Sequence, residues 1–322
     1  MPSLIPVALG VDLPAPIIES AQRVSPRLKL WTSSELERNP SVYRDAEVAL
    51  IAGWAGGDVL KDAKSLRWLQ TVGAGVDRLL TPELVARSEL LITNASGIHA
   101  QPIAEHVFGF LLAFTRNLHL AIADQPAARW NSLPYRETLR TLRGKTLGIL
   151  GLGAIGERVA EIAAPFGLRV IGLKRSATPV RGVAEVYGPD QLHEFLAQSE
   201  LLVNILPLTP TTRGWIGAPE LARLPQGAFF VNVGRGATVD TDALVAALRS
   251  GHLAGAGLDV TEPEPLPSEH PLWKLPNVII TPHYSGGQPD YYQHLGELFT
   301  DNLRRYVAGE PLRNVVDKHA GY

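Results

Sequence analysis

Three ionisable residues directly follow apolar segments in the second half of the chain. Arg235 lies in Asn232-Val233-Gly234-Arg235-Gly236, Glu264 lies in the proline-rich stretch 259–265, and His283 closes Thr281-Pro282-His283. The apolar runs before them have the length of buried strands, and parallel strands bring their carboxyl ends to one edge of a sheet. A guanidinium, a carboxylate and an imidazole are therefore expected close together at that edge.

This set of groups suits the reduction of a 2-oxo acid, in which a hydride reaches the carbonyl carbon and a proton reaches the carbonyl oxygen. An imidazole can supply the proton because it ordinarily titrates near neutral pH. A neighbouring carboxylate favours the protonated ring and fixes its orientation. The planar fork of an arginine can bind the substrate carboxylate and polarise the carbonyl. Each residue alone has another explanation: Arg235 could form a surface ion pair, Glu264 could be solvated in its loop, and His283 could be structural. Only the placement of all three after predicted strands favours a catalytic role.

A hydride donor is indicated by the segment from Gly144 to Ser176. A short apolar run is followed at once by Gly151-Leu152-Gly153-Ala154-Ile155-Gly156, then by apolar residues at helical spacing and a second apolar run, 169–173. In such a strand–turn–helix–strand unit, Gly151 permits the tight turn, Gly153 lets a pyrophosphate approach the backbone, and Gly156 lets the helix pack on its strand. The helix N-terminus then faces the phosphates. The segment predicts dinucleotide binding.

The end of the second strand indicates which dinucleotide is bound. NAD-binding units place a carboxylate there to accept hydrogen bonds from the ribose 2′-hydroxyl. This sequence has Lys174-Arg175-Ser176 instead. Two cations and a hydroxyl suit a 2′-phosphate, so NADP(H) is the preferred cofactor and NAD(H) a possible one.

Strand-like and helix-like segments alternate along the whole chain, which predicts parallel sheets with helices on both faces. The expected strands are 5–9, 28–31, 48–52, 68–72 and 90–93 in the first part, and 146–150, 169–173, 185–187, 201–206, 228–233, 256–260 and 278–281 in the second. A continuous helix is expected over the apolar segment 103–122, a less regular segment over 124–143, and a final amphipathic helix over 291–307. Two glycine-rich loops, 53–57 and 73–77, follow strands and could hold an anion on their N–H groups.

The composition excludes several classes of protein. The 322 residues are enough for two domains. A net charge of −2 gives no basic surface for nucleic acid or membrane, and the absence of cysteine removes disulfides and cysteine-ligated metals. No metal site is predicted. The N-terminal residues do not have the pattern of a signal peptide, and a cytoplasmic location is expected.

These motifs together resemble the D-isomer-specific 2-hydroxyacid dehydrogenases, which include phosphoglycerate, D-lactate and glyoxylate/hydroxypyruvate reductases, and most closely their NADP-preferring branch. The resemblance spans most of residues 95–290. It rests on the glycine turn with the strand before it (148–156), Leu206-Pro207-Leu208-Thr209-Pro210-Thr211-Thr212, the segments around Arg235 and Glu264 (231–236 and 257–266), and Thr281-Pro282-His283. Gly73-Ala74-Gly75-Val76-Asp77 matches more loosely.

The resemblance implies two Rossmann-like or flavodoxin-like doubly wound domains with a cleft between them. Residues 1–98 and 288–322 would bind the substrate, and residues 99–287 the dinucleotide. His283 would be the acid/base paired with Glu264, Arg235 would bind the substrate, and the protein would be a homodimer that pairs through its cofactor domain. The implied cofactor site is Gly151, Gly153, Ala154, Ile155, Gly156, Lys174, Arg175, Ser176, Leu206, Pro207, Thr212, Val233, Gly234, Arg235, Asp259, His283 and Gly286, with Asp259 at the nicotinamide amide. The implied substrate site is Trp54, Ala74, Gly75, Arg235 and His283.

Two features leave the substrate open. Trp54 in the substrate loop could narrow the pocket to glyoxylate-sized acids or stack on an aromatic acid, and Tyr284 and Gln288 stand where many relatives carry small residues.

Two other functions are compatible with the same fold. A binding protein that senses cofactor level, like the co-repressors on this fold, is the alternative, although it has no need of a proton donor. Formate or phosphite oxidation is a third hypothesis, and the formate enzymes carry an amide where Glu264 stands.

Overall fold

The computed structural model describes residues 3–52, 60 and 62–322, and these residues form two compact units. The first unit comprises Met1–His99 and Gln288–Tyr322, and the second comprises Ala100–Gly287. The expected division assigned residue 99 to the second domain, whereas His99 belongs to the first unit. Trp54 and the predicted glycine-rich loop 53–57 lie outside the described residues.

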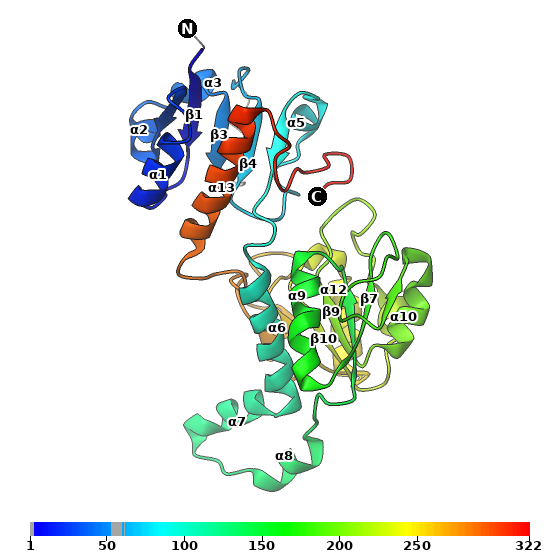
Figure 1. Ribbon diagram of the computed structural model, residues 1–322. Coiled ribbons are helices and arrows are strands. Elements are labelled where there is room, and N and C mark those ends of the chain that lie inside the picture. The colour runs from blue at the N-terminus through cyan, green and yellow to red at the C-terminus, as the bar shows by residue number, and fades with distance from the viewer. Residues whose placement is uncertain (1–2, 53–59, 61) are drawn as a thin grey trace. The chain divides into compact units, whose positions relative to one another are not determined.

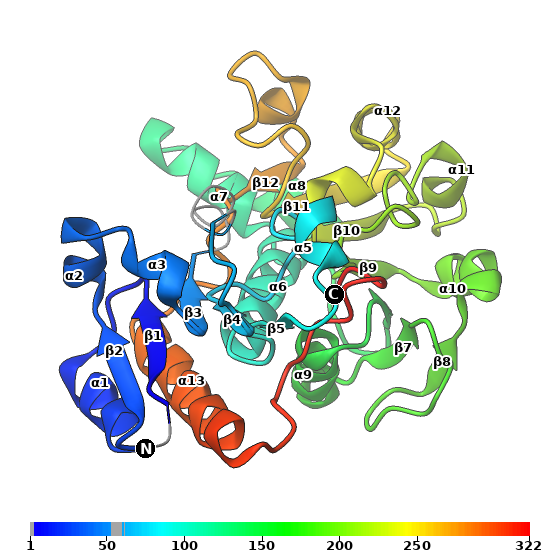
Figure 2. The same ribbon diagram turned by 90° about the horizontal axis from the view of Figure 1, so that it is seen from above.

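The first unit is a five-stranded parallel sheet with helices on both faces (Figures 1 and 2). Its strand order, β2-β1-β3-β4-β5, is the flavodoxin-like order of doubly wound proteins. The elements are β1 (Ile5–Leu9), α1 (Ala15–Gln22), β2 (Leu28–Trp31), α2 (Ser33–Arg38), α3 (Val42–Asp45), β3 (Val48–Ile51), β4 (Trp68–Thr71), α5 (Pro82–Ala86), β5 (Leu91–Thr93) and α13 (Tyr291–Ala308).

Helix α13 follows the whole second unit in the sequence but belongs to the first unit. It lies beside α1, at the blue and orange ends of the colour scale in Figure 1. Gly296 makes the contact close, since a Cβ atom there would lie 2.3 Å from Cγ2 of Ile17. Phe299 of the same helix stacks on the fully buried Trp68 of β4, with ring centroids 5.2 Å apart. These buried apolar contacts join the two ends of the chain into one core.

The second unit is a seven-stranded parallel sheet, again with helices on both faces. The strand order β8-β7-β6-β9-β10-β11-β12 is the dinucleotide-binding order, and it reverses between β6 and β9, where such sheets bind their ligand. The strands are β6 (Thr146–Leu150), β7 (Arg169–Leu173), β8 (Glu185–Tyr187), β9 (Leu201–Asn204), β10 (Ala228–Asn232), β11 (Leu253–Leu258) and β12 (Val278–Ile280). The doubly wound α/β fold class predicted for both domains is confirmed.

The helices of this unit pack on both faces of the sheet, and their apolar side chains form two buried clusters with those of the strands. They are α6 (Ala100–Thr115), α7 (Leu118–Asp124), η2 (Gln125–Ala127), α8 (Ser132–Thr138), α9 (Ala154–Ala163), η3 (Ala164–Phe166), η4 (Pro189–Gln191), α10 (Leu192–Gln198), α11 (Ala218–Leu221), η5 (Gly236–Thr238), α12 (Thr241–Arg249) and η6 (Pro271–Lys274). Figure 1 shows α6 and α9 side by side on one face. Helix α12 is capped by Asp240, whose side chain accepts a hydrogen bond from the N–H of Ala243 at 3.0 Å.

The predicted continuous helix over 103–122 is wrong, because α6 ends at Thr115 and α7 starts at Leu118. The break is at Asn117, which has a left-handed backbone (φ 52°), a conformation that asparagine tolerates better than most residues. Its side-chain amide donates to the carbonyl of Tyr135 and to Oγ1 of Thr138, at 2.9 and 2.8 Å. The segment predicted to be less regular therefore contains α8, which is held against this break.

Strand β11 also differs from its prediction, since it begins at Leu253 and ends at Leu258 instead of spanning 256–260. The observed strand also contains Gly255, although glycine is a poor strand former. A Cβ atom on Gly255 would lie 3.0 Å from Phe114, and one on Gly257 would lie 2.5 Å from Phe110. The glycines let the aromatic side chains of α6 approach the sheet, and the earlier end leaves Asp259 as the first residue beyond the strand.

Among the described residues no single helix is long and apolar enough to span a membrane. The pair Ala100–Thr115 and Leu118–Ala127 passes the test of length and composition only when taken together, and the two helices are bent by 69° at their junction.

Candidate active site

The glycine turn follows β6 at the point where the sheet order reverses. Gly151 has a positive φ of 100°, and a Cβ atom on Gly156 would lie 2.2 Å from the carbonyl oxygen of Gly151. These two glycines are required by the turn itself. Gly153, the N-cap of α9, differs because a Cβ atom there would meet nothing within 4 Å. The space in front of Gly153, Ala154 and Ile155 is therefore open to a ligand at the helix N-terminus.

The predicted 2′-phosphate site lies at the end of the neighbouring strand. β7 pairs with β6, so Lys174, Arg175 and Ser176 follow the strand beside the glycine turn. Lys174 is half-buried, whereas Arg175 and Ser176 are exposed. The N–H of Lys174 donates to the carbonyl of Tyr187 at 3.1 Å, and the N–H of Thr178 donates to that of Ser176 at 2.7 Å. Two cations and a hydroxyl thus follow one fixed strand end.

Three further residues of the implied cofactor site follow β9, on the other side of the turn. Leu206 is buried, and Pro207 and Thr212 are half-buried. The hydroxyl of Thr212 donates to the carbonyl of Pro207 at 2.7 Å, and the N–H of Thr209 donates to the same hydroxyl at 2.8 Å. These bonds close the loop over residues 207–212 into one shape beside the glycine turn.

Arg235 is held at the end of β10 by a buried polar cluster. Its carbonyl oxygen accepts hydrogen bonds from Nδ2 of Asn232 at 3.2 Å and from Oγ1 of Thr238 at 2.6 Å. Asn204 links these two side chains, because its Nδ2 donates to Oδ1 of Asn232 and to Oγ1 of Thr238. All three polar side chains are buried and satisfied. Val233 and Gly234 continue the same turn, and the guanidinium of Arg235 is half-buried.

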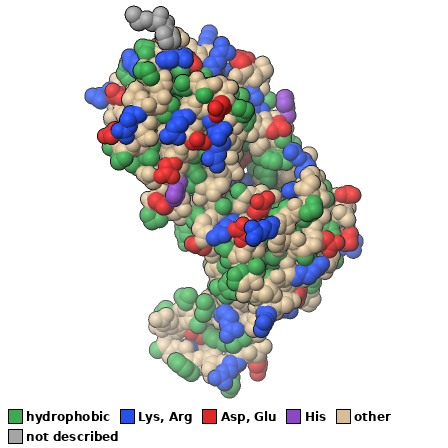
Figure 3. Space-filling model, viewed as in Figure 1, with side chains coloured by type: hydrophobic (Ala, Val, Ile, Leu, Met, Phe, Trp, Pro, Cys, Tyr) green, Lys and Arg blue, Asp and Glu red, His purple; other side chains and the backbone are tan. Residues whose placement is uncertain are grey.

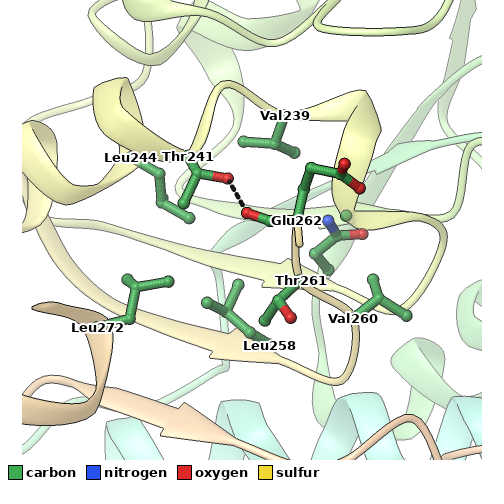
Figure 4. Close-up of a pocket in the computed structure, with 10 residues that line it drawn as sticks. Val239, Thr241, Leu244, Leu258, Val260, Thr261, Glu262 and Leu272 are labelled. Atoms are coloured by element: carbon green, nitrogen blue, oxygen red, sulfur yellow. Dashed lines mark hydrogen bonds between the residues drawn. The ribbon is translucent and has the colours of Figure 1, made fainter. Parts of the chain in front are cut away.

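The loop that carries Glu264 packs against the Arg235 turn. A Cβ atom on Gly236 would lie 2.0 Å from the carbonyl oxygen of Thr261, so the two backbones approach as closely as only glycine allows. Figure 4 shows Thr241 at the start of α12 donating a hydrogen bond to the carbonyl of Glu262, at 3.1 Å. The cavity drawn there has a volume of only about 10 Å³, room for about one water molecule at most.

The structure brings Glu264 and His283 together. Nδ1 of His283 lies 2.5 Å from Oε1 of Glu264, with the imidazole side chain 43% exposed and the carboxylate side chain 28% exposed. His283 has a left-handed backbone with a φ of 52°, a conformation that costs energy for a residue with a Cβ atom. With Nδ1 engaged by Glu264, Nε2 is the nitrogen left to meet a substrate.

Asp259 is buried directly after β11, where it contacts the loop that bears His283. Its carboxylate accepts hydrogen bonds from the hydroxyl of Thr281 at 2.6 Å and from the N–H groups of Tyr284 and Ser285, both at 3.1 Å. Its backbone carbonyl accepts the N–H of His283 at 2.9 Å. Gly286 follows in the same loop. The described contacts of Asp259 thus hold the chain on both sides of His283.

Ala74 and Gly75 belong to the other compact unit and follow β4. Nδ2 of Asn94 donates to the carbonyl of Ala74 at 2.8 Å, which fixes the loop, and Gly75 is exposed. Trp54, the remaining predicted substrate residue, lies outside the described residues.

Several residues that build the site were missed by sequence reasoning. Asn204 and Asn232 each occupy the last position of an apolar strand. A polar residue at the carboxyl end of a buried strand is therefore the signal that could have found them. His106 and Thr281 gave no such signal, because their contact joins positions 175 residues apart.

Comparison with protein-family models matches residues 108–285 to the D-isomer specific 2-hydroxyacid dehydrogenase, NAD binding domain. A glyoxylate reductase from Aeropyrum pernix is 36% identical over 281 residues, which cover 85% of this chain and 83% of that protein. A solved structure of a D-isomer specific 2-hydroxyacid dehydrogenase from Xanthobacter autotrophicus Py2, in complex with NADPH and MES, is 35% identical with a TM-score of 0.82. That alignment covers 99% of this chain and 100% of the other.

A second solved structure is an NADPH-dependent glyoxylate/hydroxypyruvate reductase from Sinorhizobium meliloti, in complex with NADP and sulfate. It is 30% identical, with a TM-score of 0.82 over 99% of this chain and 100% of the other. The strand order and the glycine turn are those of the dinucleotide-binding α/β proteins. The chain belongs to the D-isomer specific 2-hydroxyacid dehydrogenase family, as its motifs indicated.

Proposed function

We propose that the protein reduces a 2-oxo acid to the D-2-hydroxy acid, with NADPH as the preferred hydride donor and NADH as a weaker one. The observation that carries this proposal is the 2.5 Å contact between His283 and Glu264, on the same sheet edge as Arg235 and the glycine turn. A proton donor and a cationic fork beside a dinucleotide turn form the set that this reduction needs. The names of the family and its reductase members support the same reaction.

The residues present fit the cofactor. The open space at Gly153 admits a pyrophosphate, while the exposed Arg175 and the half-buried Lys174 offer two cations to a 2′-phosphate. The two solved relatives described above were crystallised with NADPH or NADP. When bound, the cofactor supplies the hydride. Leu206, Pro207 and Thr212 would contact its adenosine, and Val233, Gly234, Asp259 and Gly286 would line the nicotinamide end.

The protein supplies the proton and the orientation of the substrate. His283 holds the transferable proton on Nε2 while Nδ1–H donates to Glu264, so the carboxylate fixes the ring and balances its positive charge. The guanidinium of Arg235 binds the substrate carboxylate and draws electron density from the carbonyl. Ala74 and Gly75, in the first unit, are proposed as substrate-binding residues because backbone N–H groups in such a turn can bind a carboxylate.

The substrate is proposed to be glyoxylate, hydroxypyruvate or a larger 2-oxo acid. Tyr284, the residue after the proton donor, is 55% exposed. Because this bulky side chain follows His283, we expect it to affect the size of the 2-oxo acid that the protein accepts. A panel of acids of increasing size would test this. Trp54 is proposed to shape the same choice.

We also propose that the protein acts as a cytoplasmic homodimer that pairs through the second unit. The segment formed by α7 and α8 exposes several large apolar side chains, which are visible at the lower end of Figure 3. They are Leu118 (48% exposed), Ile122 (66%), Trp130 (92%) and Leu133 (70%). Exposed apolar groups of this size are typical of interaction surfaces. Sedimentation of the intact protein would test the dimer, with a monomer at micromolar concentration counting against it.

The activity is tested by following NADPH oxidation with glyoxylate, hydroxypyruvate and phenylpyruvate. Turnover of at least one acid is expected, and His283→Ala should lower kcat by about 10²–10⁴-fold because the proton donor is lost. His294→Ala is a matched control, since His294 also pairs with a carboxylate, at 2.9 Å from Asp290, but lies on α13. Tight NADPH binding without turnover of any 2-oxo acid would favour the cofactor-sensing alternative.

A further inference from the structure

A chain of three side chains runs from helix α6 to the loop that bears His283. Nε2 of His106, on α6, lies 2.9 Å from Oγ1 of Thr281, and this hydroxyl lies 2.6 Å from Oδ1 of Asp259. The 3.9 Å between His106 and Asp259 is too long for a direct hydrogen bond, so Thr281 is the link. None of the roles proposed above uses His106 or the side chain of Thr281.

The direction of each hydrogen bond in this chain is fixed by the groups involved. Thr281 has one hydroxyl hydrogen, and the carboxylate of Asp259 takes it. His106 must therefore donate to Thr281 from Nε2–H. Burial lowers the pKa of His106, which outweighs the opposite influence of Asp259 and favours a neutral ring at pH 7. The neutral ring carries its hydrogen on Nε2, and packing against Phe110, edge to face at 4.6 Å, holds its plane.

Asp259 in turn fixes the backbone around His283. The carbonyl of Asp259 accepts the N–H of His283, and the carboxylate accepts the next two N–H groups, those of Tyr284 and Ser285. These bonds hold His283 in its left-handed conformation, which would otherwise relax. If the carboxylate of Asp259 rotates, two of the bonds weaken together and the imidazole moves relative to Glu264.

We propose that His106 and Thr281 are positioning residues that act through Asp259 on the backbone of His283 and so set the imidazole for proton transfer. This inference rests on the proposed function, in which His283 is the proton donor. Neither residue is proposed to touch the substrate or the cofactor. Their loss should therefore lower kcat more than it changes the KM of the acid. Because Asp259 is also proposed to line the nicotinamide end, the Kd of NADPH can shift as well, but by less than kcat.

The test compares His106→Leu and Thr281→Val with the variants His106→Gln and Thr281→Ser, which keep a donor at the same place. The first pair should lose about 10- to 100-fold in kcat, because small displacements of a catalytic group have effects of this size. The second pair should recover most of that rate. His119→Leu is the matched control, since His119 is also half-buried, packs on Phe114 and bonds to the carbonyl of Ala113.

A double variant separates positioning from a merely structural role. In a His283→Ala background, His106→Leu should change the residual rate by less than about twofold, because the group that it positions is gone. A further tenfold loss in that background would overturn the inference, as would wild-type kcat in both His106→Leu and Thr281→Val. Full activity in His283→Ala would instead overturn the proposed function, so the two failures are distinguishable. Thermal unfolding of each variant identifies any that fail to fold, and the Gln and Ser variants then decide the question.

Discussion

Nδ1 of His283 and Oε1 of Glu264 lie 2.5 Å apart, although the two residues follow different strands, β12 and β11. Each is set by its own backbone support. Glu264 stands in a loop tied to α12 through Thr241, and His283 stands in a loop tied to Asp259. The His283–Glu264 pair thus joins the segments that follow two strands of the sheet, and Asp259, at the start of the Glu264 segment, also anchors the His283 loop. A change in either segment should alter the pair without unfolding the sheet.

Glu264→Gln tests the charge in this pair while it keeps the shape of the side chain. We expect the variant to fold normally and to lose about 10- to 100-fold in kcat, the equivalent of one hydrogen bond to a charged group. The amide cannot balance the charge of a protonated imidazole as a carboxylate does. Steady-state NADPH oxidation measures the effect. Glu262→Gln in the same loop is the control, and equal rates in the two variants would contradict a special role for Glu264.

A second prediction concerns the choice of cofactor. Lys174→Ala combined with Arg175→Ala should raise the KM of NADPH by about 10²-fold or more, because two charge-assisted contacts to the 2′-phosphate are lost. The KM of NADH should change by less than about threefold, since NADH has no such phosphate. The control removes two exposed cations elsewhere in the second unit, near the ends of α11 and α12, by Arg223→Ala with Arg249→Ala. Equal losses for NADPH and NADH would mean that Lys174 and Arg175 do not contact a 2′-phosphate.

The strands were predictable from the sequence because they are short segments rich in apolar residues, and the expected bounds of β1, β2, β6, β7 and β8 match those observed. The edge of the sheet where the chemistry lies was predictable for the same reason, since parallel strands expose their carboxyl ends together. Glycine positions were informative where backbone geometry demanded them, at Gly151 and Gly156.

What could not be predicted depends on contacts between distant residues. The break at Asn117 is stabilised by Tyr135 and Thr138, which no local pattern connects to it. The glycines of β11 lie against aromatic side chains of α6, which are more than 100 residues away in the sequence. The hydrogen bond between His106 and Thr281 joins a helix to a loop 175 residues away in the sequence, so no periodic pattern indicates it.

A third prediction concerns the segment of α7 and α8, which is organised by Asp124. The Asp124 carboxylate accepts hydrogen bonds from the hydroxyl of Tyr135, from Asn131 at 2.5 Å and from Arg129 at 2.8 Å. These contacts, the one with Tyr135 first, lower the pKa of Asp124 below its ordinary value of 3.8. A lowered carboxyl pKa stabilises the fold above the ordinary value, and this contribution is lost as the pH falls through the lowered pKa.

Asp124→Asn should therefore lower the melting temperature at pH 7 and speed amide hydrogen exchange in α8. It should also reduce the loss of stability below about pH 4, since the titrating group is gone. Glu161→Gln is the control, because Glu161 forms an exposed pair with Arg158 at 2.6 Å and such pairs contribute little. An unchanged melting temperature together with an unchanged acid transition in Asp124→Asn would contradict this account.

The last prediction separates the two roles of glycine in the turn after β6. Gly156→Ala should destabilise the second unit severely, because the new Cβ atom would lie 2.2 Å from the carbonyl oxygen of Gly151 and α9 would have to move. Gly153→Ala should leave the melting temperature within a few degrees, because its Cβ atom meets nothing within 4 Å. The same atom would occupy the space proposed for the pyrophosphate, so the Kd of NADPH should rise at least about tenfold. Thermal unfolding and fluorescence titration with NADPH measure the two effects. A Gly153→Ala protein that binds NADPH as tightly as the original would place the pyrophosphate away from this turn.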